Sequence, residues 1–233
     1  MNLTSEHSPI NEIIVLVALH AGYSHSSLAL HSIAAFSSDQ PYHPKIQIFE
    51  SLATQSKQRL LEQIESLHPA VIGFSTYIWN ISTSIQLAGL LKQLLPQSLI
   101  ILGGPEAGPR GEELMARYSD IDFVIDGEGE AAFRDLMCWH FYSKGKLEEI
   151  SGLVFRNGER IERNPINMLS LELVPSSITA GTMDFNKPLI YWETSRGCPY
   201  DCKFCYNSNL PFGKWRGRHG EEHHDLHGRV AGD

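Results

Sequence analysis

The chain has no long hydrophobic run and no basic side chain near its start. Its longest early apolar run, Ile13–Leu19, is seven residues, whereas a membrane-spanning helix needs about 20. The first Lys or Arg is Lys45, so the charged leader of a secretory signal is missing. These two absences predict a cytoplasmic protein that does not enter a membrane.

Basic side chains are also in deficit over the whole sequence. The 233 residues include 19 Lys and Arg against 27 Asp and Glu, which gives a net charge of −8. Surfaces that bind nucleic acids are normally basic, so this balance argues against a nucleic-acid partner. Apolar residues make up 42% and charged residues 20%, which is typical of a globular protein of one or two domains.

Alternating strand and helix patterns fill residues 12–147. Continuous β-branched runs alternate with segments whose apolar residues recur at helical spacing. The predicted strands are 13–19, 45–50, 70–75, 98–102 and 122–125, and the predicted helices are 26–36, 56–67, 82–95, 112–118 and 131–142. This order predicts an α/β fold with a doubly wound, parallel, five-stranded, Rossmann-like sheet. Ligands of such sheets bind beyond the carboxyl ends of the strands.

The pattern changes after residue 148. Asn157-Gly158 between two apolar runs is a β-hairpin signal, and the prolines of 164–188 indicate a linker. A new strand is predicted over 189–194, leading into a loop rich in cysteine. We therefore predict three parts. They are an α/β domain over 1–148, a hairpin and linker over 149–188, and the start of a second domain over 189–233.

Cysteine is scarce, and three of the four copies lie close together. Cys198, Cys202 and Cys205 form a C-x3-C-x2-C loop, while Cys138 lies in an apolar helix, where an inert buried thiol is expected. Three thiolates on one loop suit zinc, copper or an iron–sulfur cluster, and they leave one metal position open. A structural zinc site needs a fourth ligand. The candidates for it are His219, His223, His224 and His227.

The run Gly197–Cys205 reads Gly-Cys-Pro-Tyr-Asp-Cys-Lys-Phe-Cys and resembles the cluster loop of radical S-adenosylmethionine (SAM) enzymes. The resemblance implies that Cys198, Cys202 and Cys205 hold three irons of a [4Fe–4S] cluster. It implies that the fourth iron binds SAM, with Phe204 against the adenine. It further implies the start of a partial (β/α) barrel, reductive cleavage of SAM, and an electron donor such as flavodoxin or ferredoxin.

The first 148 residues resemble the cobalamin-binding domain that precedes the barrel in one group of radical SAM proteins. Two glycine-rich loops, 103–106 and 127–130, carry the resemblance, and glycines there let a flat corrin approach the backbone. Residues 75–77 are predicted to line the lower corrin face. No Asp-x-His-x-x-Gly motif follows the first strand, so no protein histidine is expected on cobalt. The predicted cofactor-binding residues are Ser75, Thr76, Tyr77, Gly103, Gly104, Pro105, Glu106, Gly127, Glu128, Gly129 and Phe204.

Little chain follows the cysteine loop. Only 28 residues follow Cys205, about one βα unit, whereas the implied barrel needs about six such units. We therefore expect a truncated chain, inactive alone, of a cobalamin-dependent radical SAM enzyme such as a methyltransferase. The alternative is a non-catalytic cobalamin carrier or sensor whose cysteine loop is idle or holds zinc. Arg196 is expected either to offset the negative charge of the cluster or to be an ordinary surface residue.

Overall fold

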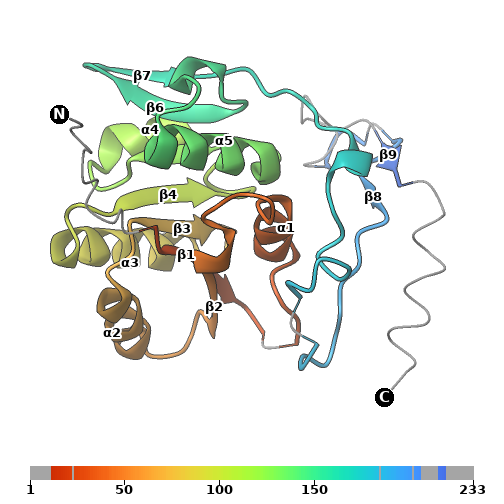
Figure 1. Ribbon diagram of the computed structural model, residues 1–233, viewed down its shortest axis with the longest axis horizontal. Coiled ribbons are helices and arrows are strands. Elements are labelled where there is room, and N and C mark those ends of the chain that lie inside the picture. Colours follow the sequence, from red (N-terminus) through yellow and green to blue (C-terminus); the bar gives the residue numbers. More distant parts are fainter. Residues whose placement is uncertain (1–11, 23, 184, 201, 206–214, 219–233) are drawn as a thin grey trace, which may run out of the picture.

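The computed structural model describes residues 12–22, 24–183, 185–200, 202–205 and 215–218, and Figure 1 shows its ribbon. The α-helices are α1 (Leu28–Phe36), α2 (Lys57–Leu67), α3 (Ile81–Leu94), α4 (Gly111–Arg117) and α5 (Gly129–Tyr142). The strands are β1 (Ile14–His20), β2 (Ile46–Leu52), β3 (Val71–Ser75), β4 (Leu99–Gly103), β5 (Phe123–Ile125), β6 (Leu153–Asn157), β7 (Arg160–Arg163), β8 (Ser195–Arg196) and β9 (Arg216–Gly217). Short 3-10 helices are η1 (His43–Lys45), η2 (Leu147–Glu149) and η3 (Leu171–Leu173).

The main sheet has the strand order β2-β1-β3-β4-β5-β6-β7. Strands β1 to β5 are parallel, which confirms the predicted doubly wound α/β sheet. The predicted hairpin forms as β6 and β7, but it joins the same sheet instead of standing apart. Strand β6 pairs antiparallel with β5, with Phe155 opposite Phe123. This pairing covers the polar backbone edge that β5 would otherwise expose.

Both faces of the sheet are covered by helices. One apolar core contains Val15 and Val17 of β1 together with side chains of α2, α3 and α4. The other contains Ile14 and Leu16 of the same strand together with side chains of α1 and α5. The alternation along β1 arises because successive strand side chains point to opposite faces. A strand buried on both faces is therefore expected to be apolar, and β1 is apolar up to its last residue, His20.

The chain after β7 runs past the carboxyl ends of the parallel strands, as Figure 1 shows in cyan and blue. The predicted strand over 189–194 is wrong. Leu189 forms one isolated bridge with His25, and a regular ladder begins only at β8, which pairs with β9. A strand is stable only when a neighbouring strand takes up its backbone hydrogen bonds, and a single bridge does not do so. Among the described residues, no helix is long and apolar enough to span a membrane.

Candidate functional site

A cavity of about 450 Å³ lies at the carboxyl ends of the parallel strands, on the face covered by α1 and α5. At its floor, two central strands carry glycine where successive side chains alternate toward this face, and above Gly103 the space is open. Gly73 of β3 lies beside Leu16 and Ile101, and Gly103 of β4 lies beside Ser75 and Ile125. Glycine inside a strand often marks a place where a ligand approaches the backbone closely.

Most of the predicted cofactor-binding residues line this cavity. The lining includes Ser75, Tyr77, Gly103, Gly104, Pro105, Gly127, Glu128 and Gly129. Three others lie elsewhere. Thr76 is fully buried behind the loop, Glu106 forms an ion pair with Arg110, and the ring of Phe204 is 94% exposed. The cavity therefore gathers the two glycine-rich loops as predicted.

Thr76 connects the loop after β3 to the loop after β4 by hydrogen bonds. Its hydroxyl donates to the carbonyl of Gly103 at 2.7 Å and accepts from the backbone N–H of Ala107 at 3.0 Å. Gly104 has φ +103°, and a Cβ there would lie 2.6 Å from the carbonyl oxygen of Thr76. Only glycine tolerates both the backbone angle and the contact, so this loop conformation requires Gly104.

Asn80 fixes the loop after β3 from the other side. Its amide donates to the carbonyls of Leu19 at 2.9 Å and Ser75 at 3.0 Å, and it accepts from the Tyr77 N–H at 2.7 Å. The Tyr77 ring stacks on Trp79 with 4.5 Å between ring centroids. Tyr77 therefore lines the cavity with its ring stacked on Trp79.

A smaller cavity of about 190 Å³ adjoins the first and shares residues such as Ser75 and Tyr77 with it. Rings surround it, and they belong to His20, His25, Tyr77, Trp79 and Tyr191. The His25 ring lies 4.7 Å from the Tyr191 ring, and burial together with His20 lowers the pKa of His25. His25 is therefore largely uncharged near neutral pH.

Glu50 is buried beside these rings, close to two histidines and a lysine. Its carboxylate lies 3.3 Å from His20 Nε2, 3.9 Å from His31 Nε2 and 3.7 Å from Lys187 Nζ, and it accepts the backbone N–H of Ser27. Burial raises the pKa of Glu50, but the hydrogen bonds and the charges of His20 and His31 outweigh burial and hold it at about 2. Glu50 thus connects β2 to β1, to α1 and to the linker.

The lowered pKa of Glu50 predicts a specific loss of stability in acid. Its folded value of about 2 lies below the ordinary 4.5, so the carboxylate stabilises the fold above pH 4.5. This contribution, roughly 3 kcal/mol, is lost as the pH falls toward 2. We expect Glu50→Gln to flatten the fall in unfolding free energy between pH 5 and pH 3, measured by urea denaturation. The exposed Glu148→Gln serves as the control, and an equal slope in both variants would contradict the assignment.

Asp126 lies directly after β5, lines the cavity and contacts the β6–β7 hairpin. It forms an ion pair with Arg163 of β7, whose guanidinium also donates to the carbonyl of Gly108. Burial raises the pKa of Asp126 in spite of this arginine. The hairpin therefore supports the loop after β5 as well as extending the sheet.

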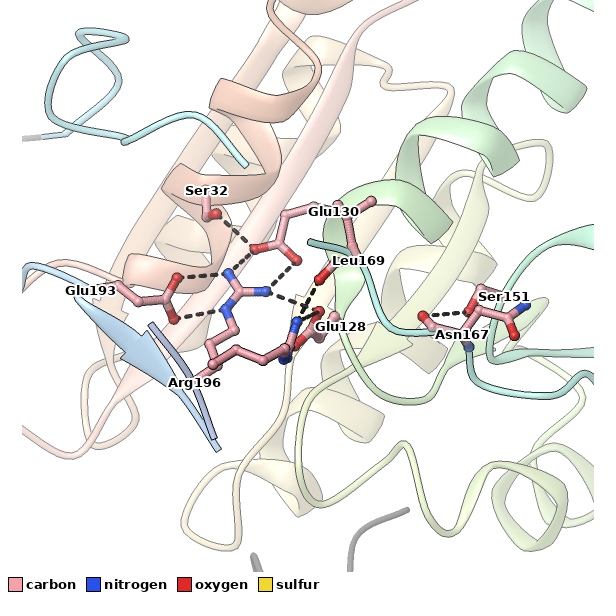
Figure 2. A network of polar contacts seen from close by, with 9 residues as sticks. Ser32, Glu128, Glu130, Ser151, Asn167, Leu169, Glu193 and Arg196 are labelled. Carbon is pink, nitrogen blue, oxygen red and sulfur yellow. Dashed lines mark hydrogen bonds and ion pairs between the residues drawn. The ribbon is translucent and has the colours of Figure 1, made fainter. Parts of the chain in front are cut away.

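Five charged side chains form a cluster at the rim of the cavity, which we call the rim cluster. It consists of Glu128, Glu130, Glu193, Arg196 and Arg216. Figure 2 shows the guanidinium of Arg196 between the carboxylates of Glu130 and Glu193, with Ser32 donating to Glu130 from α1. Burial by itself would raise the pKa of Glu130, but Arg196 and Ser32 outweigh burial. The pKa is therefore lowered overall, and Glu130 is ionised. Arg196 is therefore not an ordinary surface residue.

The three clustered cysteines lie in the chain between Arg196 and Arg216 of the rim cluster. Cys198 and Cys205 are partly buried, Cys202 is exposed, and the N–H of Cys205 donates to the carbonyl of Cys202 at 2.9 Å. Within the part of the chain that the structure describes, no three His, Cys, Asp or Glu side chains are grouped to hold a metal ion. The four candidate zinc histidines lie outside the described residues. The metal role of the cysteines stays a prediction.

Sequence reasoning missed one wall of the cavity and most of the rim cluster. The wall is formed by α1 and α5, through Leu28, Ala29, Leu30, Ser32, Ile33 and Phe133. Helical periodicity places Leu30 and Ile33 on an apolar face but does not tell core from cavity lining. Gly73 and Gly103 were the available signal, because glycines in adjacent central strands leave space on one face.

Comparison with known proteins supports the cobalamin resemblance. The B12 binding domain family matches residues 14–137. The chain is 33% identical over 148 residues to 2-(S-pantetheinyl)-carbapenam-3-carboxylate methyltransferase of Streptantibioticus cattleyicolor, covering 59% of this chain and 22% of that protein. It is 31% identical over 150 residues to the cobalamin-dependent radical SAM methyltransferase TokK of Streptomyces tokunonensis, covering 60% and 22%. The chain thus spans about a fifth of the length of these curated relatives.

The fold is also similar to that of a solved structure. The cobalamin-dependent SAM radical enzyme OxsB, with aqua-cobalamin and SAM bound, superposes with a TM-score of 0.73 at 20% identity, covering 88% of this chain and 29% of OxsB. At this identity the likeness establishes the fold alone. The family match extends from β1 through most of α5, which is more than half of the chain and includes both glycine-rich loops. The chain belongs to the B12 binding domain family.

Proposed function

We propose that this chain is the cobalamin-binding part of a cobalamin-dependent radical SAM methyltransferase. The observation that supports the proposal best is the cavity at the carboxyl ends of the parallel strands, in a chain of the B12 binding domain family. The relatives named above are methyltransferases, and one of them is named as both cobalamin-dependent and radical SAM. Methyl transfer is therefore the reaction class that we propose for the whole protein.

The residues around the cavity fit cobalamin. Five glycines line the cavity, and at these positions no side chain separates a bulky ligand from the backbone. The rest of the exposed lining is mainly apolar, and its polar side chains are Ser32, Ser75, Tyr77, Asp126 and four members of the rim cluster, Glu128, Glu130, Glu193 and Arg196. Ligand sites of this kind combine an apolar lining with a few placed polar groups. We propose that Ser75, Tyr77 and the two glycine-rich loops hold the cofactor, with no protein histidine on cobalt.

We propose that Cys198, Cys202 and Cys205 are the ligands of a [4Fe–4S] cluster, and that Phe204 contacts SAM. Thiolates are the donors that hold such clusters, so the chemistry of the donor set fits. When bound, the cluster supplies the electron for reductive cleavage of SAM, and an electron donor such as flavodoxin or ferredoxin would reduce it. The role of this chain is to bind the cofactors and to position them relative to one another.

Titration of the purified 233-residue chain with cobalamin tests the proposal. We expect a corrin spectrum that co-elutes with the protein in gel filtration, at about one cobalamin per chain. Anaerobic incubation with iron and sulfide tests the cysteine loop in the same sample. Iron with sulfide supports the radical SAM assignment, whereas one zinc per chain supports a non-catalytic carrier. Absence of co-eluting corrin would refute cobalamin binding.

A further inference from the structure

The rim cluster joins two parts of the chain that are far apart in sequence. Glu128 and Glu130 belong to the loop after β5 and to the first turn of α5, whereas Glu193 and Arg196 belong to the segment that leads into the cysteines. Arg196 Nη2 lies 2.5 Å from a Glu130 oxygen and 2.8 Å from a Glu193 oxygen, and Arg196 Nη1 lies 3.5 Å from Glu128. One guanidinium therefore links the cavity loop to the cysteine-bearing segment.

These contacts are sheltered from solvent. The exposed fractions of the side chains are 5% for Glu130, 14% for Glu128 and 15% for Arg196. Arg216 strengthens the link, because it pairs with Glu128 and donates to the carbonyl of Leu169. Ion pairs that are hydrogen-bonded and buried are costly to break, since the remaining charge loses its partner.

The rim cluster also forms part of the cavity wall. Glu128, Glu130, Glu193 and Arg196 all line the cavity, so a ligand there touches both sides of the link. We propose that the rim cluster is a latch: Arg196 is a positioning residue that docks the cysteine-bearing segment onto the cavity rim, and a ligand in the cavity strengthens this docking. The second half of this inference rests on the proposed cobalamin site, whereas the first half does not.

Chymotrypsin digestion of the 233-residue chain tests the latch. Tyr191 and Trp192 are 47% and 36% exposed and lie between two anchors, the Lys187–Glu50 contact and Arg196. Cleavage after them requires the segment to lift from the rim, so its rate follows the population of the undocked state. We expect Arg196→Met to raise this rate at least about 10-fold in the absence of any ligand, because Glu130 loses its cation. Equal rates in the parent chain and the variant would overturn the proposal.

Further variants separate undocking from unfolding. The double variant Arg196→Met/Glu130→Gln also removes the most deeply buried carboxylate; Glu128 keeps Arg216, and Glu193 is 22% exposed, so the variant should remain folded. Its segment should still be cleaved as fast as in Arg196→Met. Arg134→Met removes a surface arginine that pairs with Asp135, and it should leave the cleavage rate unchanged. Slow cleavage in the folded double variant would overturn the latch.

Cobalamin provides the second readout. We expect it to slow cleavage after Tyr191 and Trp192 at least about 10-fold in the parent chain, and to give less protection in the double variant. Bound cobalamin that protects both chains equally would overturn the coupling. Failure of cobalamin to bind at all would refute the proposed function and with it the coupling, while the digestion without ligand still decides the docking role of Arg196.

Discussion

Replacing Gly103 by Leu is expected to weaken cobalamin binding about 100-fold while leaving the chain folded. Gly103 has ordinary strand geometry, and a Cβ there meets only Ile125, at 3.8 Å, so the backbone accepts a side chain. Its position in β4 directs that side chain to the α1 and α5 face, into the cavity. Overpacking a filled site costs roughly 3 kcal/mol, which corresponds to this factor. Spectroscopic titration with cobalamin measures the change.

A graded series makes this prediction sharper. Gly103→Ala adds one carbon and should weaken binding less than Gly103→Leu. Gly89→Ala, in α3 on the opposite face, should leave binding unchanged and raise the unfolding free energy by up to about 1 kcal/mol, because Ala favours helix over Gly. If Gly103→Leu bound cobalamin as tightly as the parent chain while its melting curve stayed normal, the cavity would not be the cobalamin site.

Replacing Cys198, Cys202 and Cys205 by Ala is expected to abolish iron and sulfide incorporation. A cluster on this loop has only these thiolates as protein ligands, and an Ala side chain donates nothing to iron. Anaerobic reconstitution followed by iron and sulfide analysis and visible absorption measures the loss. The triple variant should bind cobalamin like the parent chain, because none of the three cysteines lines the cavity.

Cys138 provides the matched control for the cysteine series. It lies in α5, and its thiol faces Gln40 at 3.6 Å, while burial raises its pKa. A thiol held in its protonated form is a poor metal ligand. Cys138→Ala should therefore retain all the iron. Iron and visible absorbance that persisted in the triple variant, or that were lost from Cys138→Ala, would contradict the proposed ligand set.

The sequence predicted the parallel sheet well because the central strands are almost entirely apolar and the helices between the strands carry apolar stripes. These patterns depend on neighbours within a few residues of the chain. The prediction of a strand over 189–194 was wrong because strand pairing depends on residues that are far away in the sequence. A run such as Leu-Ile-Tyr-Trp has strand composition, but pairing depends on whether another strand lies beside it, and Leu189 finds only a single bridge to His25.

In the candidate site, too, some features could be predicted from the sequence and others could not. Its glycine-rich loops could be located because parallel strands must end at one edge of the sheet. The ion-pair partners of the charged residues around these loops could not be predicted from the sequence. From the sequence, Glu128 was predicted to bind the cofactor and Arg196 to be either a cluster neighbour or a surface residue, yet the two lie 3.5 Å apart in one ion-pair cluster.

The sequence by itself therefore determined the alternation of strands and helices along the chain, the glycine-rich loops at the ends of two strands, and the grouping of three cysteines on one loop. All of these are local patterns or follow from the regular geometry of an α/β sheet. Only the tertiary structure decided that the hairpin extends the sheet, that α1 and α5 wall the cavity, and that Arg196 bridges Glu130 and Glu193. The physical reason is that Arg196 and Glu130 are 66 residues apart, so their ion pair depends on where the chain returns after leaving the sheet.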